Sequence, residues 1–364
     1  MSRLTGLGQR LYNGKASFNI VGRRKTWYIV SSCILLVAIG SLLIRGLNLG
    51  IEFRGGADFS IPNATCSVEQ ARTVAETKTA SQAIVTVSGN GTIRVQTEPI
   101  STAESTVLAK SLATTCGVSV DQIKIQVVGP SWGSEISKKA LQGLVVFLIL
   151  VALFMSIYFE WRMAAAGLIA LAHDLIITVG LYSLFGLEVT PATVIGILTI
   201  LGFSLYDTVV VFDKVKENTR NITGQSMLTY SEAANLAVNQ TLVRSINTSI
   251  VALLPVLAII IVGAGLLGAS TLLDLAVALA VGMASGAYSS IFVATPFLVQ
   301  LKEKQPAMIA LSSRVHARRG QAAKKTGAAG DDSESSGQIL TTLEDAGQRQ
   351  QPKKLPRSKR PKNY

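Results

Sequence analysis

Six stretches of this sequence are apolar and long enough to cross a lipid bilayer, and this feature limits the fold more than any other. A helix rises about 1.5 Å per residue, so about 20 apolar residues span the hydrocarbon of a membrane. Because lipid offers the backbone no hydrogen-bond partners, we expect each stretch to be a helix. The predicted spans cover residues 27–44, 141–159, 163–187, 190–212, 245–266 and 270–300.

The charge of the chain is low and lies mostly at its ends. Only 15% of the residues are charged, against about 25% in soluble domains. Residues 1–26 contain six Lys or Arg and no acid, and residues 301–364 contain fourteen against six acids. Basic segments stay on the cytoplasmic side of a membrane, so we expect both termini there, with 301–364 a disordered basic tail. We expect anionic lipid at these ends and no nucleic-acid partner, since no nucleic-acid motif accompanies them.

Residues 46–140, between the first two spans, are then predicted to form an extracytoplasmic domain. The pattern begins with a strand over 49–61 and continues as helix, hairpin, helix and strand. This βαββαβ order is typical of a ferredoxin-like α+β domain, in which two helices cover one face of a four-stranded sheet. The signals are capping-box spacings at Ser67 with Gln70 and at Ser101 with Glu104, a turn at Asn90-Gly91, and a helix stop at Gly117.

Three cysteines leave one question open. Cys66 and Cys116 both lie in this domain, where an oxidising environment permits a disulfide, but their spacing does not decide between a bond and two free thiols. Cys33 lies in the first span, where cysteine behaves as a small apolar residue.

A polar segment over 213–244 separates the fourth and fifth spans. Its apolar residues recur at helical spacing, which predicts an amphipathic helix lying at the cytoplasmic interface. These residues are Ala233, Leu236, Ala237, Leu242 and Val243.

Charged residues inside the spans are the candidate functional residues, because each costs several kcal/mol to place in lipid. Asp174, preceded by His173, lies near the middle of the third span, and a hydrogen-bonded core residue is the alternative interpretation of His173. Asp207 lies about 9 Å from the cytoplasmic end of the fourth span. Arg244 lies at the start of the fifth, where an interfacial anchor is the alternative interpretation. Asp274 lies in the first turn of the sixth, where a helix dipole favours an acid and a structural role is expected.

These residues predict a proton relay and no catalytic residue, cofactor or metal. Ser204 and Thr208 lie on the same side of the helix as Asp207 and are predicted to support it by hydrogen bonds. Movement of Arg244 toward or away from Asp207 would switch proton affinity and couple the proton motive force to a rearrangement. Small residues and prolines favour close packing and kinks, namely Gly282 and Gly286 at GxxxG spacing, Pro255 and Pro296.

Several motifs resemble the SecF family, the smaller subunits of the bacterial SecDF complexes in the RND superfamily. The resemblance covers nearly all of residues 20–300, in order. It is carried by "GLNLGIEFRGG", "VVGPSWGSEI", "ALAHDLIITVGLYSLFGLEVT", "LTILGFSLYDTVVVFDKVKENTR" and "NQTLVRSINTS".

The resemblance implies an RND-type half with six transmembrane helices in the bacterial cytoplasmic membrane. It implies pairing with SecD, association with the SecYEG channel and SecA, and use of the proton motive force to assist late export of a translocating polypeptide. YajC and YidC are further candidate partners. Asp207 and Arg244 match the family's proton-pathway positions, and His173 and Asp174 match its third-span motif. Tyr206 departs from the family, which usually has Asn there.

Two other functions are compatible with intramembrane aspartates. A proton-driven RND-type exporter of lipids or drugs usually has two six-span halves, and this chain has one. An intramembrane aspartyl protease also uses two aspartates on neighbouring spans, but "LAHD" around Asp174 lacks the GxGD sequence of that class.

Overall fold

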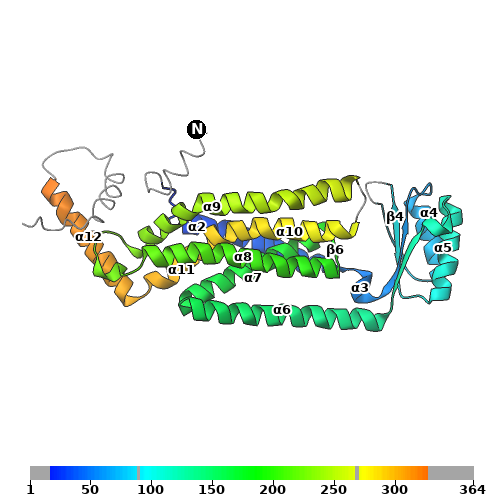
Figure 1. The fold of residues 1–364 in the computed structure, drawn as a ribbon, viewed down its shortest axis with the longest axis horizontal. Helices are drawn as coiled ribbons and strands as arrows, with labels where there is room; N and C mark the ends of the chain where they lie inside the picture. The colour runs from blue at the N-terminus through cyan, green and yellow to red at the C-terminus, as the bar shows by residue number, and fades with distance from the viewer. Residues whose placement is uncertain (1–16, 88–90, 267–269, 327–364) are drawn as a thin grey trace, which may run out of the picture.

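In the computed structural model, long helices run side by side and a small domain lies at one end of them (Figure 1). The structure describes residues 17–87, 91–266 and 270–326. Six helices within these ranges are long and apolar enough to cross a membrane, which confirms the predicted number of spans. They contain α2 (Arg24–Arg45), α6 (Pro130–Tyr158), α7 (Trp161–Phe185), α8 (Pro191–Asn218), α9 (Tyr230–Ala258) and α10 (Ser270–Ser289).

The helix bundle has two distinct ends. The domain end is the end that faces the small domain, and the tail end is the end next to α12 (Pro306–Thr326) (Figure 1). At the tail end, Arg24 pairs with Glu303 at 2.6 Å, and Lys302 forms an ion pair with Glu160. These contacts join the first and last spans, and the last span to the α6–α7 turn.

Two spanning helices contain a π-helical segment beside a proline. Helix α9 continues into η3 (Ile259–Leu266) four residues after Pro255, and α10 continues into η4 (Ser290–Ala294) before α11 (Thr295–Glu303). Proline has no N–H for the regular helical bond, so the backbone pairing must change near it. At η4 the Thr295 hydroxyl donates to the Ser290 carbonyl at 3.1 Å. The irregularities expected at the two prolines therefore take the form of wide helical turns.

The small domain is a four-stranded antiparallel sheet with two helices. The chain order is β2 (Gly56–Ile61), α4 (Val68–Thr79), β3 (Ile84–Val87), β4 (Ile93–Thr97), α5 (Thr102–Cys116) and β5 (Lys124–Val128). The strands lie in the order β3-β4-β2-β5, which is the ferredoxin-like arrangement that a βαββαβ chain produces.

The local sequence signals predicted for this domain are present in its structure. Both capping boxes are present, and Gly117 ends α5 with φ +66°. Strands β3 and β4 pair from Val87 with Ile93, while the predicted turn at Asn90 lies outside the described residues. Helices α4 and α5 cover the face of the sheet that points away from the bundle (Figure 1). The core between them includes Phe59, Val95, Leu108 and Leu112, each 1% exposed or less.

The strand predicted over 49–61 is wrong in its first half. The chain forms β1 (Asn48–Leu49) and a short helix α3 (Ile51–Arg54) before β2 begins. Gly55 and Gly56 have φ of +79° and +150°, and a Cβ on Gly56 would lie 2.5 Å from the Thr97 carbonyl. The two glycines therefore turn the chain sharply into the sheet.

The domain is joined to the bundle through a short connection between α7 and α8. Strand β6 (Glu188–Val189) pairs in parallel with β1. Arg94 of the sheet donates to Glu188 at 2.5 Å and also pairs with Asp58, and Gln96 donates to Glu188 at 2.9 Å. Burial raises the pKa of the Asp58 carboxyl, while the Arg94 charge opposes that rise. The polar face of the sheet is thus tied to the bundle by the Arg94–Glu188 ion pair and the Gln96–Glu188 hydrogen bond.

The predicted interfacial helix of 213–244 is instead the first half of α9. Residues 213–218 complete α8, and a capping box of Thr229 and Glu232 starts α9, which continues unbroken past Arg244. No proline interrupts it before Pro255. Its apolar residues pack into the bundle core, and Asn235 and Asn239 accept backbone N–H groups of residues 18–21.

The prediction of disorder over 301–364 is wrong for the described part of that segment. Residues 301–303 complete α11, and residues 306–326 form α12. Leu311 and Val315, one turn apart, are fully buried in the bundle core. Arg319 donates to both carboxylate oxygens of Glu232 at 2.7 and 2.9 Å, which raises the pKa of its guanidinium. Residues 327–364 lie outside the described ranges.

The open question of the cysteines is decided by the structure, in which Cys66 and Cys116 form a disulfide and Cys33 is free. The bond joins the start of α4 to the end of α5.

We therefore expect one maleimide adduct on the denatured, unreduced protein and three after reduction, measured by intact mass. Three adducts before reduction would contradict the bond. Replacing both cysteines with Ser should destabilise the domain by roughly 2–4 kcal/mol, because the bond closes a long loop.

Candidate functional site

Asp174 lies at the centre of the bundle and has no exposed surface. Three serine hydroxyls from two other helices donate to its carboxylate. Ser204 of α8 donates at 2.5 Å, and Ser285 and Ser289 of α10 donate at 2.7 and 2.6 Å. His173 places its Nδ1 3.1 Å from the same carboxylate. A buried carboxylate is costly unless its lone pairs are satisfied, and these donors satisfy them.

Asp207 is the second intramembrane carboxylate, and it is only partly buried. Ser245 of α9 donates to it at 2.7 Å, and Ser290 of η4 donates at 2.5 Å. Within the described residues, its side chain has no cationic partner. Asp207 is therefore held at membrane depth by neutral hydroxyls.

The two carboxylates are joined through neighbouring residues of one helix. Ser289 donates to Asp174 and Ser290 donates to Asp207, so consecutive side chains at the start of the π turn serve different carboxylates. Each hydroxyl can both donate and accept a hydrogen bond. The site is therefore a cluster of two aspartates and five serines on four helical elements, α7, α8, α9 and α10 with η4.

Sequence reasoning located both aspartates but not four of these serines. Ser285, Ser289 and Ser290 lie in "GMASGAYSS", whose glycines predict only a packing surface, and Ser245 follows Arg244. The spacing of four between Ser285 and Ser289 places them on one helix face and could have indicated a polar stripe. Nothing in one sequence, however, shows which carboxylate each hydroxyl contacts.

The structure corrects the predicted support of Asp207. Ser204 lies one turn before Asp207 and donates to Asp174 instead, because its side chain points toward α7. The Thr208 hydroxyl is buried and has no hydrogen-bond partner in the described structure. His173 Nε2 is also buried without a partner there, and its ring stacks on Tyr288 with centroids 6.1 Å apart.

Arg244 does not contact Asp207 in this conformation. Its guanidinium donates to the Tyr206 hydroxyl at 3.4 Å, and both side chains lie on the outer surface of the bundle, with Tyr206 52% exposed. Tyr206, the position where the resemblance implies Asn, here contacts the cation expected beside Asp207. Asp274 is apart from this cluster, at the domain end of α10, where its backbone carbonyl accepts the Tyr182 hydroxyl at 2.6 Å.

Close approach of α10 to α8 brings the serines to the carboxylates. A Cβ on Gly286 would lie 2.9 Å from Ser204 Cβ and 3.1 Å from its Cα, so α8 backbone packs directly on this glycine. Gly282 lies against the side chain of Ile200, whose Cγ2 would lie 2.2 Å from a Cβ on that glycine. The prediction that this GxxxG pair allows a helix to approach closely is confirmed.

We therefore expect Gly286→Ala to push α10 from α8 and weaken the hydrogen bonds to Asp174, at a cost of roughly 1–3 kcal/mol. The midpoint of thermal unfolding in detergent measures this change. Gly202→Ala is the matched control, because nothing lies within 4 Å of the added Cβ on that glycine of α8. The control should be neutral or slightly stabilising. Equal stability of both variants would contradict the close contact.

Comparison with known proteins places this geometry in a family. Residues 107–304 match the family described as "Protein export membrane protein SecD/SecF, C-terminal", and residues 40–57 match the "SecD/SecF GG Motif". The protein translocase subunit SecF of Streptomyces coelicolor is 52% identical over 326 residues, covering 89% of this chain and 87% of that protein. The chain belongs to the SecF family.

Other SecF relatives support this assignment. The protein translocase subunit SecF of Mycobacterium tuberculosis is 45% identical and covers 81% of this chain and 69% of that protein. The crystal structure of SecDF from Thermus thermophilus is similar with a TM-score of 0.71 at 32% identity, covering 79% of this chain. The chain spans only 39% of that SecDF chain. The glycines of the GG motif are Gly55 and Gly56, which turn the chain from α3 into β2.

The geometry does not favour the protease alternative. Aspartyl proteases pair two carboxyl groups that share a proton. In the described structure Asp174 and Asp207 have separate hydroxyl partners and no hydrogen bond to each other. No group of three or more His, Cys, Asp or Glu within the described residues could hold a metal ion.

Proposed function

We propose that this chain is the SecF-type subunit of a protein export complex and that it uses the proton motive force to assist late steps of export. The membership in the SecF family supports the export role, since its relatives are named protein translocase subunits. The observation that carries the proton coupling is the position of Asp207, an acid at membrane depth whose only described partners are serine hydroxyls. Such an acid can gain or lose a proton without breaking an ion pair.

The serine cluster gives the proton a second acceptor. Ser289 donates to Asp174 and the next residue, Ser290, donates to Asp207, and each hydroxyl group can both donate and accept a hydrogen bond. The Thr208 hydroxyl and His173 Nε2 add two buried polar atoms that have no hydrogen-bond partner in the described structure. The coupling requires no cofactor besides protons.

Arg244 is the group whose movement would sense the charge of Asp207. In this structure its guanidinium contacts Tyr206, the residue before Asp207 in the chain. An ionised Asp207 would attract the guanidinium, and a protonated one would release it. The two positions of Arg244 then correspond to two arrangements of α9 against α8, biased by protonation.

A SecD-type chain is the partner that this geometry favours. SecD and SecF are parts of one chain in the SecDF protein of Thermus thermophilus, of which this chain matches 39%. Tyr206, Arg244 and Thr248 are exposed on α8 and α9 at membrane depth, where contact with lipid would be costly. A second helical half covering this face would remove them from lipid.

The remaining partners and the orientation follow from the same proposal. The disulfide favours an oxidising side for the small domain, and the basic ends favour the cytoplasmic side of a bacterial cytoplasmic membrane. The small domain would then face the translocating polypeptide as it leaves SecYEG, after SecA has acted. YajC and YidC are candidate partners, and anionic lipid would contact the basic ends.

Asp207→Asn tests the proton coupling. We expect export of a secreted reporter into membrane vesicles to become independent of an imposed proton gradient, because one proton releases about 2.3 kcal/mol per 100 mV only if a group carries it. The measurement is the rate of late-stage export with and without the gradient. Asp213→Asn is the matched control, since Asp213 lies in the same helix and is exposed.

The result is interpreted only where the variant still copurifies with its partner. If Asp207→Asn retains the same gradient-dependent rate as Asp213→Asn, the relay through Asp207 is disproved. If both variants lose export without losing assembly, the charge of the helix and not the proton is responsible.

A further inference from the structure

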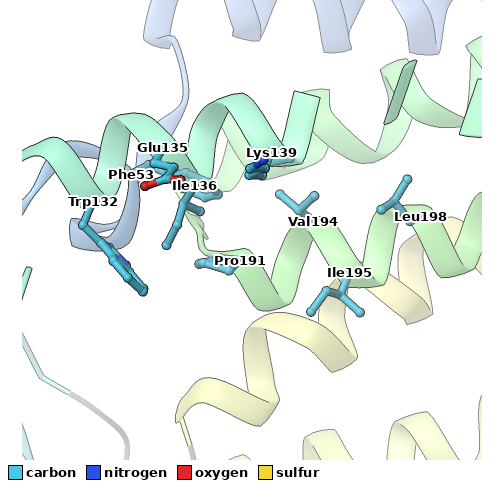
Figure 2. A pocket seen from close by; sticks show the side chains of 10 residues that line it. Phe53, Trp132, Glu135, Ile136, Lys139, Pro191, Val194, Ile195 and Leu198 are labelled. Atoms are coloured by element: carbon cyan, nitrogen blue, oxygen red, sulfur yellow. The ribbon is translucent and has the colours of Figure 1, made fainter. Parts of the chain in front are cut away.

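An apolar cavity of about 430 Å³ lies between α6, α8 and α3 at the domain end (Figure 2). Trp132 and Ile195 on its rim are 60% and 61% exposed, so the cavity opens to the outside of the bundle. Figure 2 shows side chains of α6 and α8 facing each other across it. The apolar lining comprises Phe53, Trp132, Ile136, Val194, Ile195 and Leu198.

The cavity reaches the depth of lipid headgroups. From residue 141 to residue 158, α6 has no charged side chain and rises about 27 Å, close to the thickness of the hydrocarbon layer. Lys139 precedes this segment by two residues. The ammonium group of Lys139 therefore lies where lipid phosphates lie, and the apolar lining continues from it toward the hydrocarbon at Leu198.

Two opposite charges stand at the mouth of the cavity. Glu135 and Lys139 both line it and are one helical turn apart on α6. Neither side chain forms an ion pair or a side-chain hydrogen bond in the described part of the chain. A ligand that carries both an anion and a cation, followed by an apolar chain, would match this arrangement.

We propose that this cavity binds one phospholipid with a phosphoethanolamine headgroup. The phosphate pairs with Lys139, the ethanolamine ammonium pairs with Glu135, and an acyl chain lies between α6 and α8 along Val194 and Leu198. Such a site lies apart from the carboxylate cluster and depends on the chain being in a bilayer, but not on proton use or protein export.

The chemistry of the lining favours a lipid over a segment of a partner protein, because apolar side chains lie beside two opposite charges at headgroup depth. An extended acyl chain is apolar along its whole length and matches the apolar side chains. An anionic headgroup without an amine would leave Glu135 unpaired beside it and would be repelled by that carboxylate.

The experiment uses the full chain copurified with its partner from bilayers containing equal amounts of phosphatidylethanolamine, phosphatidylglycerol and phosphatidylcholine with identical acyl chains. Native mass spectrometry measures which lipid stays bound as activation increases. We expect one phosphatidylethanolamine to be retained several-fold over the other two.

Lys139→Ala and Glu135→Gln should each reduce this retention several-fold, and Leu198→Trp should reduce it by filling the cavity. Lys138→Ala is the matched control, because Lys138 is exposed but does not line the cavity, and retention should be unchanged.

Three outcomes would overturn the proposal. Equal retention of the three lipids would mean that the cavity holds only bulk lipid. Preference for phosphatidylglycerol with no effect of Glu135→Gln would mean a site for anionic lipid. Photo-crosslinking from position 195 to the partner protein, with no lipid retained, would mean that the partner covers the cavity. None of these outcomes changes the expected result for Asp207→Asn, so the two proposals fail separately.

Discussion

The structure depends on the need to satisfy a buried carboxylate with neutral hydrogen-bond donors. Asp174 has no exposed surface, and lipid provides neither water nor a counter-ion. Its oxygens are reached only because α8 and α10 pack closely enough for serine hydroxyls, which are short, to bridge the gap. Gly282 and Gly286 make that approach possible, so the hydrogen bonds to Asp174 depend on the close packing of α8 and α10.

The features predicted correctly from sequence are those whose cause is local. A membrane span is recognised from length and hydropathy alone, and all six were found. The ferredoxin-like order followed from capping residues such as Ser67 and Ser101, whose hydrogen bonds lie within four residues of the chain. The identity of Asp207 and Asp174 as unusual residues also followed from local context, because a charge inside an apolar run is visible without a structure.

What sequence reasoning missed depends on contacts between distant segments. In the sequence, the serines of "GMASGAYSS" are recognisable only as small polar residues. Their role as donors becomes visible when the structure places the aspartates of α7 and α8 against them. The residues of α12 are predicted to belong to a disordered tail because that tail has too little apolar content to fold alone, yet Leu311 and Val315 pack in the bundle core. Arg244 is expected beside Asp207, but the neighbouring residue Tyr206 provides a competing acceptor for its guanidinium.

The connectivity of the chain links the carboxylate cluster to the small domain. Asp174 lies on α7 and Asp207 on α8, and the connection between these helices contains Glu188, which Arg94 and Gln96 of the sheet hold by hydrogen bonds. A shift of α7 against α8 would therefore displace Glu188 and pull directly on β4. The helices that carry the two acids are thus attached to the sheet by their own connecting segment.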